Sequence, residues 1–176
     1  MELVISDSII LKPLDISHAV ELYQVIADSR ENLSQFLPWV DYVIDVNSTK
    51  RYIYERLHSG KAGSQWFAVY IEDRLSGVFG IKHIDPDSKG AECGYWLADF
   101  ARGQRAMNQV LTKIVPYIKN NSHAKVIEFC CLEENLASIK VVQRAGAQFK
   151  YYQKETSIFL ANQQQQRLGV YEIKLT

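Results

Sequence analysis

A short segment in the middle of the chain, "DFARGQRAM", has the residue order of an anion-binding loop. It follows an expected strand and opens an expected helix, whose first N–H groups lack partners within the helix and whose dipole is positive at that end. Arg102 adds positive charge, and Gly103 lets a ligand approach the backbone closely. A basic surface turn that only caps a helix would show the same pattern, because short glycine motifs also occur by chance.

A second polar segment begins where another apolar segment ends. Asn135 follows "KVIEFCC" and the short connection "LEE", it opens an expected helix, and Ser138 comes one turn later. Asparagine is a strong N-cap. The carboxyl end of a parallel strand is also where open α/β sheets bind ligands. One asparagine can therefore cap the helix and face a cleft at the same time.

A lone carboxylate, Glu92, lies in the segment "AECGYWL" among apolar or small residues. If such a carboxylate is half buried and faces a cleft, it has the properties of a general base that works near neutral pH. A glutamate on the solvated face of a strand would fit the same periodicity equally well. The sequence pattern leaves both interpretations open.

The elements that must position these residues follow from periodicity and from turn residues. The strand–helix–strand unit from Glu92 to Leu132 predicts a parallel, right-handed crossover within a mostly antiparallel sheet. We therefore predict an α+β fold with one mixed sheet and helices on both faces, as a single domain over residues 1–176. We expect strands over 3–14, 64–71, 75–85, 91–99, 125–132, 149–160 and 169–175, and a hairpin loop at the "QQQQ" of 163–166. Helices are expected in the region 15–36, capped by Asp15 or Ser17, and from an Asn47 or Ser48 cap to Gly60. Two more are expected over 106–120, where Pro116 should bend or end the helix, and from Asn135 to Gly146.

The composition excludes several classes of protein. Lys plus Arg and Asp plus Glu both number 20, so wholesale electrostatic binding of nucleic acid is not expected. We expect no membrane association, because no apolar segment approaches the roughly 20 residues that cross a bilayer, and the N-terminus lacks the pattern of a secretory signal. Cys93, Cys130 and Cys131 have no zinc-like spacing, which predicts free, buried thiols and a cytoplasmic protein.

Taken together, three phrases resemble the GNAT superfamily of N-acetyltransferases: "LSGVFGIKHID", "GYWLADFARGQRAMNQVL" and "KVIEFCCLEENLASIKVVQRAGA". The resemblance covers nearly the whole chain, including the opening strand with "LKPL", the "LPW" after the first helices and the closing hairpin. Within the superfamily, the chain is most similar to the RimJ/RimL-type ribosomal-protein N-terminal acetyltransferases. This resemblance implies acetyl-CoA as co-substrate, no metal ion, and a sheet with one parallel strand pair at the cofactor cleft.

The resemblance also implies roles for individual residues. Glu92 matches a strand carboxylate that is often assigned as general base, and Ser138 would protonate the leaving thiolate. The strand backbone would bind the pantetheine arm, the loop would hold the pyrophosphate, and the amide that opens the next helix would bind the cofactor arm. The implied cofactor-binding residues are Trp96, Leu97, Ala98, Arg102, Gly103, Gln104, Arg105, Ala106, Met107, Asn135 and Ser138.

The chain departs from the family pattern at Arg105, where the family usually has glycine, and at Ala106, where a large apolar residue is usual. If the position required a positive φ angle, a side chain there would cost roughly 1–2 kcal/mol. If the backbone is already helical, the cost is small and the guanidinium can neutralise phosphate charge. We expect the second case, with Arg105 at the rim of the phosphate loop.

The acceptor is open to more than one interpretation. The resemblance favours the N-terminal α-amino group of a ribosomal protein that begins with Ala or Ser. A small amine such as an amino acid, polyamine or antibiotic is the alternative acceptor, and a non-catalytic acetyl-CoA-binding module is the alternative outside enzymes. The region of Phe36, Trp39 and Tyr42 is expected to form the acceptor wall, with Phe36 better explained as core. We expect a monomer or a homodimer.

Overall fold

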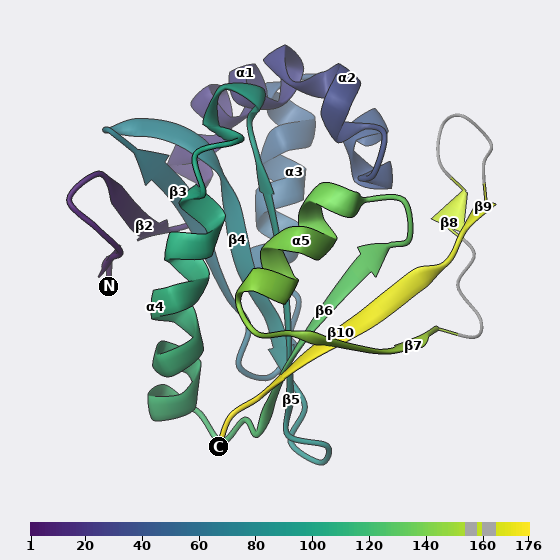
Figure 1. Ribbon diagram of the computed structural model, residues 1–176. Coiled ribbons are helices and arrows are strands. Elements are labelled where there is room, and N and C mark those ends of the chain that lie inside the picture. Colours follow the sequence, from purple (N-terminus) through teal and green to yellow (C-terminus); the bar gives the residue numbers. More distant parts are fainter. Residues whose placement is uncertain (154–157, 160–164) are drawn as a thin grey trace.

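The computed structural model describes residues 1–153, 158–159 and 165–176. Its main feature is an eight-stranded sheet with the strand order β1-β2-β3-β4-β5-β6-β10-β7 (Figure 1). Adjacent strands of this sheet are antiparallel except for the pair β5–β6. The predicted α+β fold with one parallel pair is confirmed. The strands are β1 (Leu3–Val4), β2 (Ile9–Pro13), β3 (Gln65–Ile71), β4 (Arg74–Ile84), β5 (Gly90–Leu97), β6 (Val126–Leu132), β7 (Gln148–Tyr152), β8 (Ile158–Phe159), β9 (Gln165–Gln166) and β10 (Leu168–Lys174), and the α-helices are α1 (Ala19–Asp28), α2 (Arg30–Leu33), α3 (Val46–Leu57), α4 (Ala106–Asn121) and α5 (Leu136–Arg144).

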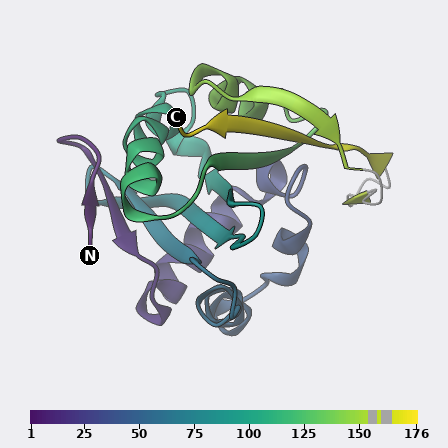
Figure 2. The same cartoon turned by 90° about the horizontal axis from the view of Figure 1, so that it is seen from below.

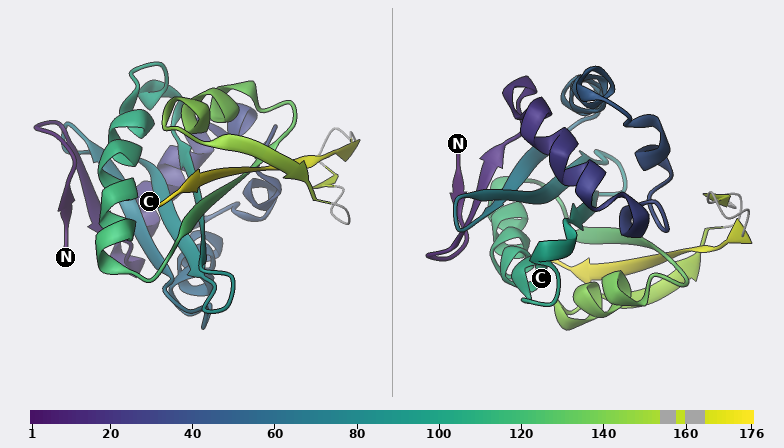
Figure 3. Two further views of the ribbon diagram at one scale, coloured as in Figure 1. Left: turned by 60° about the horizontal axis from the view of Figure 1, so that its bottom comes forward. Right: turned by 90° about the horizontal axis from the view of Figure 1, so that it is seen from above.

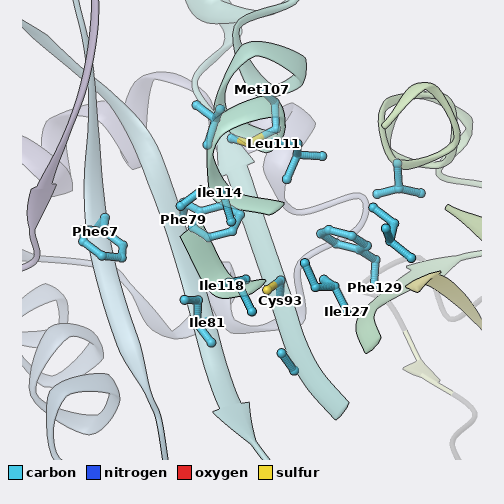
Figure 4. Close-up of a cluster of buried hydrophobic side chains, with 14 of the residues drawn as sticks. Phe67, Phe79, Ile81, Cys93, Met107, Leu111, Ile114, Ile118, Ile127 and Phe129 are labelled. Atoms are coloured by element: carbon cyan, nitrogen blue, oxygen red, sulfur yellow. The ribbon is translucent and has the colours of Figure 1, made fainter. Parts of the chain in front are cut away.

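Helices cover both faces of the sheet, as the sequence predicts. Figure 2 and the right view of Figure 3 show α1, α2 and α3 on one side, with α4 and α5 on the other. Each side has its own core, because successive strand residues point to opposite faces. On the α4 side, Met107, Leu111 and Ile114 pack over Phe79 and Cys93 (Figure 4). The other core joins α1 and α3 to residues of β3, β4 and β5.

The first segment forms two strands, although the sequence analysis expected one. β1 pairs with β2 in an antiparallel hairpin, with Leu3 opposite Leu11. The break falls at Ser6, Asp7 and Ser8, which are turn-forming residues. Two hydrogen bonds close the loop. The Ile9 N–H donates to the Ser6 carbonyl, and the Ile5 N–H donates to the Ile9 carbonyl.

Helix ends on the α1–α3 side are capped by acidic side chains. Asp15 accepts from the Ser17 N–H and caps a 3-10 turn that leads into α1, as one of the two expected caps. For α3, the cap is Asp45 instead of Asn47 or Ser48. Asp45 accepts from the Ser48 N–H at 2.7 Å, and the Ser48 hydroxyl accepts from the Asp45 N–H at 3.0 Å. The expected serine thus takes part in this capping box, three residues into the helix.

Pro116 does not end α4, which runs without interruption from Ala106 to Asn121. A proline removes one helical hydrogen bond, to the carbonyl four residues earlier. Here that residue is Thr112, and both Pro116 and Thr112 are exposed. Water can therefore satisfy the Thr112 carbonyl, and the helix continues.

The end of the chain matches the sequence expectation only in part. β10 runs antiparallel to both β6 and β7. Gln165 and Gln166 belong to β9, which pairs with β8, whereas this stretch was expected to be a loop. The predicted strand over 149–160 and the rest of the "QQQQ" extend beyond the described residues. Of the three free thiols, Cys93 and Cys131 are buried and Cys130 is partly exposed.

Candidate active site

Two cavities meet at the carboxyl ends of β5 and β6. The first has a volume of about 200 Å³ and lies against the N-terminal ends of α4 and α5. The second has a volume of about 340 Å³ and lies over β4, β5 and β6 on the α3 side. A donor and an acceptor could thus approach each other from two directions. The residues that line both cavities are Phe36, Leu37, Tyr95, Trp96, Asn135 and Ser138.

The cleft exists because the two parallel strands separate. Pairing between β5 and β6 ends at Cys93 and Phe129, yet β5 continues to Leu97 and β6 to Leu132 (Figure 1). On its other side, β5 stays paired with β4 as far as Leu97. The backbone of β5 beyond Cys93 therefore turns an unpaired edge toward β6. Such an edge can bind an extended ligand with peptide-like groups as an added strand.

The N-terminus of α4 lies at the first cavity and has no side-chain cap. The first helical hydrogen bond runs from the Gln109 N–H to the Arg105 carbonyl, so the three preceding N–H groups have no partner within the helix. Arg102, Gly103 and Arg105 line the cavity beside them. Gly103 has a φ of 78°, and a Cβ at this position would meet nothing within 4 Å. The loop thus offers free donors and positive charge in an open space.

Arg105 has a left-handed backbone, with φ 56° and ψ 21°. The expectation that this position is already helical is therefore wrong, and the arginine occupies a conformation that favours glycine. The chain must turn sharply there, because Ala106 and Met107 both point into the core while Arg105 is exposed. The left-handed residue costs roughly 1–2 kcal/mol, which the burial of the following helix offsets.

The N-terminus of α5 is closed by its own residues. The Asn135 side chain accepts a hydrogen bond from the Ser138 N–H at 3.3 Å. The Ser138 hydroxyl is left for other contacts: it lies 3.2 Å from the Tyr95 hydroxyl and 3.6 Å from the Cys131 sulfur. Burial raises the pKa of Tyr95 and of Cys131, so both groups hold their protons at neutral pH. The hydroxyls of Tyr95 and Ser138 therefore lie side by side where the two cavities meet.

Glu92 lines the second cavity and is one quarter exposed. One carboxylate oxygen accepts from the Lys82 ammonium at 2.9 Å, and the other lies 3.7 Å from Nδ1 of His83. Gly94 makes room for this ion pair, because a Cβ there would come within 2.8 Å of the Lys82 side chain. Glu92 thus borders the cavity with one carboxylate oxygen bonded to Lys82, which holds the side chain in place.

Aromatic side chains form the wall of the second cavity. Trp39 lies against Tyr52, with ring centroids 4.5 Å apart, and against Trp96 at 5.8 Å. The Trp96 indole N–H donates to the Tyr52 hydroxyl at 3.0 Å. Arg56 follows Tyr52 by one turn of α3 and stacks on its ring.

Tyr42 was expected beside Trp39, but the structure places it 80% exposed and in neither cavity. Both residues lie on the 3-10 turn Pro38–Tyr42. Residues three apart share a face in such a turn. Val40 and Val43 take the buried face. Of the two, only Trp39 packs against α3, through the Tyr52 ring. The expected acceptor wall therefore includes Trp39 but not Tyr42. Phe36, expected as core, is partly buried and lines both cavities.

The structure brings most of the expected cofactor residues together, but not all of them. Ala98 is buried and lines neither cavity, and its N–H donates to the Ser76 carbonyl at 2.8 Å. Gln104 also lies outside, with its side-chain amide bonded to the Phe100 carbonyl. The expected cofactor residues that do line the first cavity are Trp96, Leu97, Arg102, Gly103, Arg105, Ala106, Met107, Asn135 and Ser138.

The sequence analysis missed several residues of the site, among them Tyr95, Lys82, Tyr52, Arg56 and Trp66. Tyr95 stands two residues before Leu97 and so shares its face, which was a usable signal. Tyr52 and Arg56 have the i, i+4 spacing of a helical pair. No sequence pattern indicated Lys82, because its contact with Glu92 depends on a shift in the β4–β5 register between Ile81 and His83.

The described residues hold no cluster of three or more side chains suited to a metal ion. None of the helices in the same part of the chain is long and apolar enough to cross a bilayer.

Comparisons with known proteins agree with this geometry. The chain is 28% identical over 143 residues to a ribosomal-protein-serine acetyltransferase of Escherichia coli (strain K12), covering 81% of this chain and 80% of that protein. Among solved structures, the RimL ribosomal alpha-N-protein acetyltransferase in complex with CoA, linked by a disulfide between CoA and a cysteine, superposes with a TM-score of 0.90 at 22% identity. That match covers 99% of this chain and 98% of the other.

A microcin self-immunity acetyltransferase in complex with acetyl-CoA and AMP has a TM-score of 0.87 at 20% identity, over 97% and 94% of the two chains. Both structural likenesses concern the fold. The model of the acetyltransferase (GNAT) domain matches residues 8–148, which include the strand edge, the loop and both helix N-termini described above, and the chain therefore belongs to this family of enzymes.

Proposed function

We propose that this protein transfers the acetyl group of acetyl-CoA to the N-terminal α-amino group of a protein. One observation carries the proposal: two cavities of different character meet at Tyr95 and Ser138. The first offers a free strand edge and an uncapped helix N-terminus, which suit a long phosphate-bearing cofactor. The second offers a carboxylate within an aromatic wall, which suits an amine attached to a larger acceptor.

The residues of the first cavity fit acetyl-CoA, whose bound thioester would supply an activated acetyl group. The N–H groups at the start of α4 would hold the pyrophosphate, with Arg102 and Arg105 adding charge. The β5 backbone at Trp96 and Leu97 would bind the pantetheine arm along its unpaired edge. The Asn135 amide would donate to the same arm while its oxygen stays on the Ser138 N–H.

The reaction needs one proton transfer from the attacking amine and another to the leaving thiolate. An α-amino group has a pKa near 8, so part of it is protonated at pH 7 and must lose a proton before it attacks. Glu92 is the carboxylate in the acceptor cavity that can take this proton. The β5 N–H groups beyond Cys93 would stabilise negative charge on the carbonyl oxygen. The Ser138–Tyr95 pair would donate a proton to the leaving thiolate.

The acceptor is proposed to be a ribosomal protein that begins with Ser or Ala, which would place the enzyme in the cytoplasm. The support is the relative named as a ribosomal-protein-serine acetyltransferase, which matches four fifths of both chains. A small amine is the second candidate, because the wall of Trp39, Tyr52 and Trp66 would also suit a flat ring. A neighbour of the same fold was solved with AMP.

Acetyl-CoA turnover separates these candidates. The protein is assayed for thiol release against N-terminal peptides of ribosomal proteins and against a panel of amino acids, polyamines and aminoglycosides. We expect turnover with peptides that begin with Ser or Ala, and none when their α-amino group is blocked by formylation. Turnover with small amines alone would replace the proposed acceptor. Binding of acetyl-CoA in calorimetry without turnover of any acceptor would indicate a non-catalytic module.

A further inference from the structure

The acceptor cavity contains three charged side chains, and only two of them are paired. Lys82 and Glu92 form an ion pair at 2.9 Å. Arg56 lines the same cavity, and within the described part of the chain no carboxylate lies within ion-pair distance of it. With two cations and one anion, the lining of the cavity carries a net positive charge, which Glu55 offsets only from outside the cavity and beyond ion-pair distance. That charge belongs to Arg56.

Aromatic rings hold the Arg56 guanidinium in one place. Its Cζ lies 3.4 Å from the centre of the Tyr52 ring, 5.1 Å from that of Trp66 and 5.5 Å from that of Trp39. Gly80 lets Trp66 lie flat on the sheet, because a Cβ there would come within 2.4 Å of the Trp66 ring. Cation–π contacts partly replace the lost water. These contacts fix the plane of the guanidinium group before any ligand binds.

The donors of Arg56 are incompletely used. Nη1 donates to the Tyr52 carbonyl at 3.1 Å, whereas Nε is buried and has no hydrogen-bond partner. Burial also lowers the pKa of the guanidinium, although an arginine stays charged at neutral pH. A partly buried cation with an unbonded N–H is costly unless an anion completes it. The planar fork of arginine matches a carboxylate, with which it forms two parallel hydrogen bonds.

We propose that Arg56 determines acceptor specificity by binding a carboxylate of the acceptor. The inference rests on the proposed function, and it adds the chemical class of the residues that follow the reacting amine. Glu92 and Ser138 mark the reacting end of the cavity, and Arg56 lines the same space of about 340 Å³. The carboxylate must therefore be close to the amine, in an acidic side chain within the first few residues of a peptide. In a small acceptor, the α-carboxylate of an amino acid would have the same chemistry.

The test uses matched acceptors that differ only in this charge. Peptides that begin with Ser carry Glu or Gln at position two, three or four in an otherwise constant sequence, and free serine is compared with serinamide. We expect the wild-type protein to prefer one Glu peptide over its Gln partner by at least tenfold in kcat/KM, mainly through KM. Because the contact is ionic, the preference should shrink as salt rises.

Variants assign the preference to Arg56. Arg56→Gln should abolish the Glu over Gln preference and leave the KM for acetyl-CoA unchanged, and Arg56→Lys should keep part of it. Arg51→Gln is the matched control, since it removes an exposed arginine from the same helix and should retain the full preference. Melting temperatures are measured for all variants, and Arg56→Lys serves if Arg56→Gln does not fold.

The outcomes separate the two proposals. If peptides are acetylated but Glu and Gln partners are equal in the wild-type protein, or Arg56→Gln lowers both alike, Arg56 only packs the wall and the inference is wrong. If only serine is acetylated and serinamide is not, the carboxylate assignment stands and the protein acceptor falls. Absence of acetylation with every acceptor would overturn both.

Discussion

The first cavity, proposed to hold the acetyl donor, and the second cavity, proposed to hold the acceptor, are built from different parts of the chain. We call them the donor cavity and the acceptor cavity. The donor cavity relies on backbone: the unpaired edge of β5 and the free N–H groups at the start of α4. The acceptor cavity relies on side chains, with the Lys82–Glu92 pair and the aromatic wall around Arg56. A site made of backbone survives substitutions that keep the fold, whereas a site made of side chains changes with each residue. We therefore expect substitutions to have larger effects in the acceptor cavity and at the junction than in the phosphate loop.

The largest effect is expected for Glu92→Gln, in the acceptor cavity. The change removes the proposed base and breaks the ion pair with Lys82, so turnover should fall by roughly 10²- to 10⁴-fold. The affinity for acetyl-CoA should stay nearly constant, because Glu92 does not line the donor cavity. Steady-state rates from pH 6 to 9 together with calorimetry check both parts. Unchanged turnover over that range would move the base to an ordered water or to His83.

A smaller but clear effect is expected for Ser138→Ala, at the junction. The maximal rate should drop more than tenfold, because the hydroxyl that faces Tyr95 and Cys131 is lost. The melting temperature should change little, since Ser138 joins the helix cap through its backbone N–H, which alanine keeps. A loss of about 1 kcal/mol in stability with a normal rate would show that the hydroxyl serves the helix end instead.

The sequence indicated the backbone of this site better than its side-chain contacts. Strand, loop and helix order follow local periodicity, so the parallel crossover and the loop before α4 were predictable. The contacts of Tyr95 with Ser138 and of Trp96 with Tyr52 join elements far apart in the chain, and no local pattern encodes them. The left-handed Arg105 was missed for a related reason. Its conformation is imposed by burial of the helix that follows, against the preference of the residue itself.

Asn135 caps α5 and is proposed to bind the cofactor as well, and two substitutions separate these roles. Asn135→Ala should cost about 1 kcal/mol of stability, because the Ser138 N–H loses its acceptor. Asn135→Asp keeps an acceptor and should retain the stability, but it removes the amide donor and should weaken acetyl-CoA binding severalfold. Thermal unfolding and calorimetry distinguish the two. Equal affinity in the aspartate variant and the wild-type protein would restrict Asn135 to capping.

The smallest effects are expected at Arg105, where charge and backbone can be tested separately. Arg105→Gln keeps the Cβ and removes the charge, so acetyl-CoA binding should weaken by about fivefold or less, as for an exposed ion pair of at most about 1 kcal/mol. The difference should shrink as salt rises. Arg105→Gly should weaken binding to the same extent, because the N–H groups of α4 keep their directions in either variant. Glycine should also raise the melting temperature, since it removes the cost of a side chain at φ 56°. Tighter binding in the glycine variant than in the wild-type protein would mean that the arginine obstructs the phosphate loop, and the donor cavity would then depend on side chains as much as the acceptor cavity does.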